Sequence, residues 1–383
     1  MLENVVFIGG YRTYIGKENG IYRHIPAEKL GAHILEKMAG QYELPQLVIA
    51  GNAIGAGGNI ARLMTLEAGF PDEIPAITVD SQCSSGLEAI LLAVAKIQSG
   101  QQEIIMAGGM ESSSTAPKRA LVENHPEYQG ETWYKTAKFA PGNRQEDAML
   151  LGAEKTAKVA GINRQQLHKW VLRSHHHAAT ARKQGLLEEI IAPIGVKNER
   201  DQGIRESMTE AFLDKISPIY GEEGVTTAGN ACGTQDGAAF VLLCSEHFAK
   251  EHNYLPQMQY VDMAEVAGNP EMSPSLVNPA IDALLKKTGK HPEEIDMYEC
   301  NEAFAVIDEL FAEKYPGCVP AYNAWGGALA YGHPYGATGG ILTLHLAQRM
   351  KQMSQNDGYG MTAIAAAGGM GAAILWKKWG GWA

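Results

Sequence analysis

The sequence predicts an α/β fold made of two similar halves with a separate segment between them. Two glycine-rich units carry the same order of expected elements, and the tetrapeptide Ala-Gly-Gly-Met closes each of them, at Ala107–Met110 and at Ala367–Met370. Self-similarity of this kind indicates repeated supersecondary units that bury their apolar faces against one another. The 383 residues also exceed what one ordinary core requires, which fits two or three packed units.

The first unit is a strand, a turn, a helix and a second strand. The β-branched run Pro75–Val79 predicts the first strand, and the turn that follows it contains Cys83. Leu87–Gln98 has a helical composition and ends before Gly100, a residue typical of the position after a helix. The apolar run Ile104–Met106 predicts the second, buried strand.

The second unit lies near the C-terminus and repeats this order. Pro320–Tyr322 leads into a glycine-rich turn that contains His333. A helix is expected over Thr338–Met350, and an apolar strand over Met361–Ala366 follows it. Because the two turns occupy equivalent positions, we expect Cys83 and His333 to meet where the halves join.

The region between the units has a different character. Residues 117–225 are polar and include an amphipathic helix near Arg164–Gln184, which is typical of an inserted loop domain that covers a ligand. We therefore expect an N-terminal half over residues 1–116, to which residues 226–255 return. The C-terminal half is expected over residues 256–383.

Composition and charge exclude several classes of function. A formal net charge of -11 disfavours nucleic acids and anionic membranes as partners. The apolar run Val5–Ile8 has no basic residues before it, so it predicts a first strand and not a signal peptide. The five cysteines form no Cys-x-x-Cys pair, which favours reduced thiols in a cytoplasmic protein. No metal site is expected at His175–His177, because consecutive helical positions point about 100° apart.

Three residues have the chemistry of an acyl-transfer site. Cys83 follows a strand near a helix start, where the helix dipole is expected to lower the thiol pKa and free N–H groups can stabilise an oxyanion. A cysteine at such a place is more often structural, so a catalytic role for Cys83 also requires a partner base. His333 is flanked by glycines and Pro334 and can serve as the partner base. Asn301 can supply a polar third group.

These residues lie in motifs that resemble those of the thiolase superfamily. Asp80–Gly86 resembles the nucleophile motif, Asn301–Phe304 matches the Asn-Glu-Ala-Phe motif, and Gly326–Pro334 resembles the histidine motif. The similarity extends to three further segments, which are Arg12–Lys17, Gly108–Ser112 and Thr227–Ala231. The motifs occur in the family's order along the whole chain.

The resemblance implies a five-layered α-β-α-β-α fold with an inserted loop domain that holds coenzyme A. It implies that an acyl-CoA acylates Cys83 while His333 accepts the thiol proton. Asn301 would hold a water that forms one oxyanion hole with His333, and the backbone N–H groups of Cys83 and Ala367 would form the other. The acyl-CoA is then a substrate and no cofactor is needed. A homodimer or homotetramer is expected.

The resemblance also assigns two residues to the coenzyme A site. Arg205 lies where the family has an arginine that meets the nucleotide end of coenzyme A; a solvated surface arginine is the alternative. Cys232 replaces a serine that lies beside the pantetheine in the family. A small packed cysteine is the simpler interpretation of that residue.

The chain departs from the family at a catalytic position. Thiolases carry a second cysteine near the C-terminus, and Ala365 stands at that place. A methyl group cannot move a proton, and a positioned acid or base contributes ~10²–10⁴ in rate. Three functions therefore remain open. They are a thiolase-type acyltransferase on a 3-ketoacyl-CoA such as acetoacetyl-CoA, a non-thiolytic condensing or acyl-transfer enzyme, and an inactive CoA-binding protein.

Overall fold

The computed structural model describes residues 2–142, 144–355 and 357–382. The strands are β1 (Val5–Arg12), β2 (Gly16–Lys17), β3 (Leu47–Gly51), β4 (Ala76–Val79), β5 (Ile104–Ser112), β6 (Arg119–Ala120), β7 (Trp133–Tyr134), β8 (Gln235–Ser245), β9 (Met258–Ala267), β10 (Met297–Cys300), β11 (Tyr359–Ala366) and β12 (Met370–Lys378). The α-helices are α1 (Ala27–Ala39), α2 (Ile60–Glu67), α3 (Ser85–Gln98), α4 (Ala148–Ala160), α5 (Arg164–Lys183), α6 (Glu210–Leu213), α7 (Glu246–Glu251), α8 (Val277–Thr288), α9 (Ala305–Lys314), α10 (Ala328–Tyr331) and α11 (Thr338–Lys351). The short 3₁₀ helices are η1 (Gln82–Ser84), η2 (Glu188–Ile190), η3 (Pro270–Leu276), η4 (Pro292–Glu294), η5 (Pro316–Ala321) and η6 (Tyr335–Ala337). No helix within the described residues is long and apolar enough to cross a membrane.

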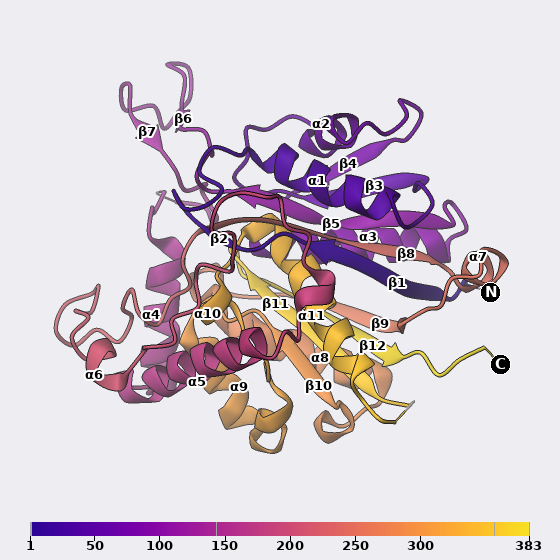
Figure 1. Ribbon diagram of the computed structural model, residues 1–383. Coiled ribbons are helices and arrows are strands. Elements are labelled where there is room, and N and C mark those ends of the chain that lie inside the picture. Colours follow the sequence, from indigo (N-terminus) through magenta and orange to yellow (C-terminus); the bar gives the residue numbers. More distant parts are fainter. Residues whose placement is uncertain (1, 143, 356, 383) are drawn as a thin grey trace.

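Helices and strands alternate in five layers (Figure 1). Helices α1 and α2 cover the outer face of the N-terminal strands, α3 and α11 pack together in the middle, and α8 covers β9 and β12. The strand order is β10-β11-β12-β9-β1-β8-β5-β3-β4, so within the described residues the two groups of strands join only where β1 meets β9. That junction is short, with the pairs Val6–Gln259 and Phe7–Met258. The predicted α-β-α-β-α fold is confirmed.

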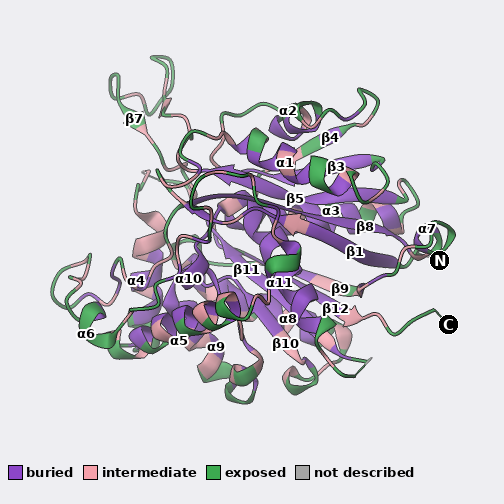
Figure 2. Cartoon of the chain, viewed as in Figure 1, coloured by how far each residue is buried: buried purple, intermediate pink, exposed green. Residues whose placement is uncertain are grey.

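The central strands are buried on both faces, as Figure 2 shows by their uniform colour. Successive side chains of a strand point to opposite faces. In β3, Leu47 and Ile49 belong to the central cluster with α3 and α11, whereas Val48 and Ala50 belong to the outer cluster under α1 and α2. Strands with both faces covered are expected to be continuously apolar, which is the pattern of β3.

The Ala-Gly-Gly-Met repeat has two different structures. The second copy forms the turn between β11 and β12, with Gly368 and Gly369 at φ values of +89° and +75°. The first copy lies inside β5, which continues to Ser112. The prediction that the tetrapeptide closes both units is therefore wrong for the first one. Pairing with β8 out to Ser112 supplies the hydrogen bonds that keep this segment extended.

The second unit also lacks the predicted first strand. Pro320 lies within η5, and Tyr322 forms only one isolated bridge, with Tyr298 of β10. The strand of this half that runs parallel to β11 is β10, and Asn301 follows it directly. The predicted helices and the later strands have counterparts in α3, α11, β5 and β11.

The segment from 117 to 225 contains β6, β7 and helices α4 to α6, after which β8 pairs between β1 and β5. Helix α5 packs against α9 and α10. A buried ion pair also fixes the segment, because the Arg12 guanidinium donates to both carboxylate oxygens of Asp201 at 2.9 Å. The same carboxylate accepts from the Ile15 N–H. Residues 200–205 are thereby held against the start of the chain.

Candidate active site

Cys83 lies on a tight turn between β4 and α3. The turn is η1, and Gln82 adopts a left-handed φ of +57° that L-residues rarely take. The Gln82 N–H donates to Asp80 Oδ1 at 2.9 Å, which holds this conformation. The Cys83 side chain is buried, with 8% of its surface exposed.

The environment of Cys83 keeps its thiol protonated. Burial raises the thiol pKa to about 12, while hydrogen bonds from the backbone N–H groups of Ala367 and Cys83 act in the opposite direction. The predicted lowering of this pKa is therefore wrong. The helix α3 starts two residues later, and loss of water around the thiolate outweighs the local dipoles. A neutral thiol needs a base to accept its proton during attack.

The two backbone donors expected for an oxyanion hole lie at the sulfur. Ala367 belongs to the turn after β11, and β11 packs against η1. The backbone N–H groups of Ala367 and Cys83 both lower the pKa of the Cys83 thiol, so they lie close to its sulfur. A carbonyl oxygen of a thioester bound at this sulfur would therefore meet backbone donors.

His333 is buried, and its tautomer follows from its neighbours. Its Nδ1 lies 2.6 Å from Thr338 Oγ1, and the Thr338 hydroxyl donates to the Pro334 carbonyl at 2.9 Å. The hydroxyl has one hydrogen, so it accepts from Nδ1–H of the imidazole. Nε2 therefore carries the free electron pair. Burial lowers the His333 pKa to about 3, so the ring is a neutral base at neutral pH.

Asn301 lies beside the free nitrogen of His333. Its Nδ2 is 3.3 Å from His333 Nε2, and both side chains are buried. Within the described part of the chain, Asn301 Oδ1 is buried and has no hydrogen-bond partner. An unpaired buried oxygen of this kind is costly, and a water or a substrate donor would satisfy it.

Close glycine contacts bring the two turns together. A Cβ atom at Gly336 would lie 2.5 Å from the Gly51 carbonyl oxygen and 2.6 Å from that of Met110, so only glycine fits there. This contact places η6, two residues after His333, against η1 with Cys83. The rings of His333 and Tyr335 meet edge to face at 4.9 Å. No direct hydrogen bond joins Cys83 to His333 in the ranges that the structure describes.

Comparison with known proteins assigns this architecture to a family. Residues 5–247 match the family model described as "Thiolase, N-terminal domain", and residues 254–378 match "Thiolase, C-terminal domain". The chain belongs to the thiolase family. The predicted superfamily and the predicted acyltransferase class are thereby confirmed.

Individual thiolase relatives match over nearly the whole chain. A Bacillus subtilis (strain 168) protein named "Putative acetyl-CoA C-acetyltransferase YhfS" is 33% identical over 376 residues, which cover 98% of this chain and 99% of the relative. A Staphylococcus haemolyticus (strain JCSC1435) protein named "Putative acetyl-CoA C-acetyltransferase VraB" is 34% identical over 393 residues, which cover 99% and 100%. The crystal structure of the Bacillus anthracis acetyl-CoA acetyltransferase matches with a TM-score of 0.92 at 28% identity and covers 98% of this chain and 99% of that one.

Glu111 is a site residue that sequence reasoning did not single out. It lies on β5, is fully buried, and accepts hydrogen bonds from the N–H groups of Ala53 at 2.9 Å and Gly336 at 3.0 Å. The side chain of Asn52 donates to it at 2.8 Å. In the sequence, the feature that could have indicated Glu111 is a single carboxylate directly after Gly-Gly-Met, at the end of a predicted strand. Glu111 positions the turn that carries His333.

Cys232 lies at the edge of the same site. Two residues later, Thr234 forms a backbone bridge with His333. Burial raises the Cys232 pKa, and the nearby Cys83 raises it further. The half-buried Cys232 packs against the apolar cluster that contains Ala365. Cys232 and Ala365 thus belong to the same apolar cluster.

Arg205 does not reach this group of residues. Its exposed side chain lines a separate cavity of about 460 Å³ together with His175, His176 and His177. Its backbone N–H donates to His175 Nδ1 at 3.2 Å. Across the described ranges, no group of three or more side chains is arranged to hold a metal ion.

Proposed function

We propose that this thiolase is an acyl-CoA acyltransferase that carries the acyl group on Cys83, with a 3-ketoacyl-CoA of the acetoacetyl-CoA type as substrate. The observation that supports this most strongly is that a buried thiol and a buried neutral base lie on two turns that the glycine contact between the halves holds together. Backbone donors at the sulfur add to it. A protein that only binds coenzyme A does not need this arrangement.

The acylation step uses groups of this chain alone. In the direction of synthesis, Cys83 Sγ attacks the thioester carbon of acetyl-CoA, and its proton passes to His333 Nε2. The N–H groups of Cys83 and Ala367 bind the carbonyl oxygen as it becomes negative. The bond from carbon to the coenzyme A sulfur then breaks, and the proton on His333 moves to the leaving thiolate. The products are the Cys83 thioester and free coenzyme A.

The remaining groups have proposed roles around this step. Asn301 lies at His333 Nε2, and its unpaired oxygen is suited to hold a water. Arg205 is the proposed contact for the nucleotide end of coenzyme A, and Cys232 the proposed neighbour of the pantetheine. The protein is proposed to act as a homodimer or homotetramer, which light scattering would decide.

Ala365 favours a second candidate, a non-thiolytic condensing enzyme. Cleavage of a 3-ketoacyl thioester produces a carbanion that must receive a proton, and Ala303 and Phe304 join Ala365 in an apolar cluster there. A condensation in which loss of carbon dioxide creates the carbanion needs no base at this place. Both candidates share the Cys83 acyl-enzyme.

Intact-mass measurement after incubation with acetyl-CoA tests the shared step. We expect one acetyl adduct on the wild-type chain and none on the Cys83→Ala variant. Cys232→Ala is the matched control, since it removes the neighbouring thiol and should still carry one adduct. An adduct that persists in Cys83→Ala, or none on the wild type across a series of acyl-CoAs, would contradict the proposal.

A second assay separates the two candidates. Wild-type enzyme is mixed with acetoacetyl-CoA and coenzyme A, and separately with malonyl-CoA after Cys83 has been acetylated. Loss of acetoacetyl-CoA supports the thiolase reaction. Release of carbon dioxide without such loss supports the condensing enzyme.

A further inference from the structure

The segment that carries Cys232 connects the two loops of the proposed catalytic residues. The Cys232 N–H donates to the Ala303 carbonyl at 2.9 Å, and Ala303 lies two residues after Asn301. Two residues after Cys232, Thr234 forms a backbone bridge with His333. Backbone pairing on both sides therefore holds Cys232 between the loop of Asn301 and the turn of His333.

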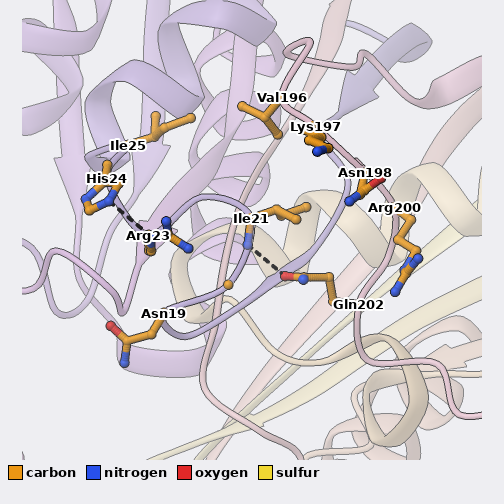
Figure 3. A pocket seen from close by; sticks show the side chains of 11 residues that line it. Asn19, Ile21, Arg23, His24, Ile25, Val196, Lys197, Asn198, Arg200 and Gln202 are labelled. Atoms are coloured by element: carbon orange, nitrogen blue, oxygen red, sulfur yellow. Dashed lines mark hydrogen bonds between the residues drawn. The ribbon is translucent and has the colours of Figure 1, made fainter.

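The first turn of the chain fixes the outer side of this segment. The Thr234 hydroxyl donates to the Glu18 carboxylate at 2.6 Å, and the Glu18 N–H donates to the Thr234 carbonyl at 3.3 Å. Beyond Glu18, residues 19–25 line a cavity of about 590 Å³ together with residues 196–202 (Figure 3). Cys232 is not among the residues that line this cavity, so the cavity and the thiol are separate features.

Cys232 differs from the other cysteines in its exposure and its neighbours. It is half-buried, whereas the other four are buried. Burial raises the Cys232 pKa, and the charge of a Cys83 thiolate raises it further, so the two thiols lie near each other. The pKa of the Tyr335 hydroxyl is raised in the same way, by burial and then by both thiols. Cys83, Cys232 and Tyr335 thus form one cluster of protonated groups, and the Tyr335 ring contacts His333.

Two buried amide oxygens beside this cluster lack a donor. Within the described residues, Asn301 Oδ1 and Gln235 Oε1 have no hydrogen-bond partner. A Cβ atom at Gly332, directly before the proposed base, would lie 2.6 Å from Gln235 Nε2. One at Gly233, directly after Cys232, would lie 3.1 Å from the same atom. Because a buried acceptor without a donor is costly, a water or a polar substrate is expected in the space beside this thiol.

Cleavage of acetoacetyl-CoA needs a proton at a carbon atom. Once Cys83 has attacked the keto carbon, the bond between carbons 2 and 3 breaks and leaves a carbanion on acetyl-CoA. His333 Nε2 has by then taken up the thiol proton of Cys83, and the Asn301 amide lies 3.3 Å from it. This crowding favours a second donor. A thiol has an ordinary pKa of about 8.5 and a phenol one of about 10, so Cys232 is a stronger acid than Tyr335.

We propose that the Cys232 thiol donates this proton, which makes Cys232 a second catalytic residue. The role rests on the acyl-enzyme function proposed for Cys83. The S–H bond of Cys232 breaks as a C–H bond forms at carbon 2, and acetyl-CoA leaves with a complete methyl group. The proton that His333 took from Cys83 then passes to the Cys232 thiolate, and the acetyl group stays on Cys83. In synthesis the same transfers run in reverse, with the Cys232 thiolate as the base.

Two single-turnover reactions that differ only in the leaving group test this role. Acetyl-CoA and acetoacetyl-CoA both place an acetyl group on Cys83, but the first releases a thiolate and the second a carbanion. Cys232→Ala should slow acetylation by acetoacetyl-CoA at least ~100-fold, because the carbanion has lost its donor. The same variant should slow acetylation by acetyl-CoA by no more than about 3-fold. Rapid quenching and intact-mass measurement follow both reactions, and the mass distinguishes an acetyl from an acetoacetyl adduct.

Two further variants separate the proton from the packing of the side chain. Cys232→Ser keeps nearly the same size, but its hydroxyl is a much weaker acid than a thiol. It should therefore show the same selective loss with acetoacetyl-CoA as Cys232→Ala. Cys318→Ala is the matched control, since it removes a buried thiol in η5, which packs against α9 and η4. It should react with both thioesters like the wild type.

The outcomes distinguish a failure of Cys232 from a failure of the acyl-enzyme. No adduct on the wild type from either thioester would contradict the acyl-enzyme and the donor together. An adduct from acetyl-CoA with equal acetoacetyl-CoA rates in wild type and Cys232→Ala would overturn the role of Cys232 alone. The same holds if Cys232→Ala slows both reactions equally, or if Tyr335→Phe and not Cys232→Ala loses the cleavage reaction.

Discussion

The Glu111 carboxylate accepts a hydrogen bond from the backbone N–H of Gly336 at 3.0 Å. Glu111 belongs to β5 in the N-terminal half, whereas Gly336 lies three residues after His333 in the C-terminal half. The same carboxylate accepts from Ala53 and Asn52. One buried side chain thus ties the strand ends of one half to the turn that carries the proposed base of the other.

Replacing Glu111 by Gln should loosen this turn. One oxygen becomes an NH₂ group that faces backbone donors, so the free energy of unfolding should fall by ~1–3 kcal/mol. The acylation rate of Cys83 should fall about 10-fold or more, because the base is no longer held in place. Urea unfolding and the mass-detected rate measure the two effects. Glu103→Gln, an exposed glutamate one residue before β5, should change neither.

The effect of Glu111→Gln on the free energy of unfolding should depend on pH. Burial raises the Glu111 pKa from 4.5 to about 7, so between these values the folded state holds a proton that the unfolded state has lost. The contribution of Glu111 to stability is therefore full below pH 4.5 and is lost as the pH rises to about 7, by up to about 3 kcal/mol. The difference in unfolding free energy between wild type and Glu111→Gln should shrink across this window. A difference that grows with pH would contradict the assignment.

Thr338 fixes the tautomer of His333, and Thr338→Val should remove that control at constant shape. The imidazole Nδ1–H loses its buried acceptor, so the ring can turn or carry its proton on Nε2. The acylation rate should fall roughly 10- to 100-fold. Thr338→Ser keeps the hydroxyl and should stay within about 3-fold of the wild type. Equal losses in both variants would mean that packing, and not the hydrogen bond, is what matters.

The glycine contact between the halves should tolerate no side chain. Gly336→Ala would place Cβ 2.5 Å from the Gly51 carbonyl oxygen, so one backbone segment must move. A loss of at least ~1–3 kcal/mol in unfolding free energy is expected, together with loss of acylation. Gly40→Ala is the matched control. Its Cβ would meet atoms no closer than 3.5 Å, and its φ of -72° suits alanine. The free energy of unfolding measured with denaturant should therefore be unchanged or slightly higher.

Local signals in the sequence predict much of the fold and part of the site. The helix α3 was predictable because Gly100 marks its end, and Cys83 and His333 were predictable because their flanking glycines form recognisable motifs. The raised pKa of Cys83 was not predictable, since it arises from burial by layers that are distant in sequence. Glu111 was missed for the same reason, because its partner Gly336 is 225 positions away.

The cavity of about 590 Å³ between residues 19–25 and residues 196–202 was also not predictable from the sequence. Arg23 and Arg200 come from different segments, and neither lies in a recognisable motif. They face one cavity because the Arg12–Asp201 ion pair holds residues near 201 against the start of the chain. Spacing along the chain carries no information about such a pairing.

The ion pair of Arg12 and Asp201 should be essential for that arrangement. Asp201→Asn keeps the shape but leaves the buried guanidinium without a counter-charge, which typically costs about 3–5 kcal/mol. The thermal midpoint should fall, and proteolysis should cut the 117–225 segment sooner than in the wild type. Asp72→Asn, which removes an exposed carboxylate 3.9 Å from Arg62, should leave both readouts unchanged. An Asp201→Asn protein as stable as the wild type would show that other contacts hold the segment.

The pH profile of acylation should reveal that thiol and imidazole react as a neutral pair. The His333 pKa is lowered to about 3 and the Cys83 pKa is raised to about 12, so both groups stay neutral across the accessible range. The single-turnover rate should therefore be flat between about pH 5 and pH 9. His333→Gln removes the base, so attack then requires the thiolate, and the much slower rate should rise about tenfold per pH unit. A wild-type profile with an inflection near the ordinary histidine pKa of about 6.5 would mean that His333 is solvated in the working enzyme. An imidazole exposed to water cannot keep so low a pKa, so a flat profile is the expected result for the buried ring.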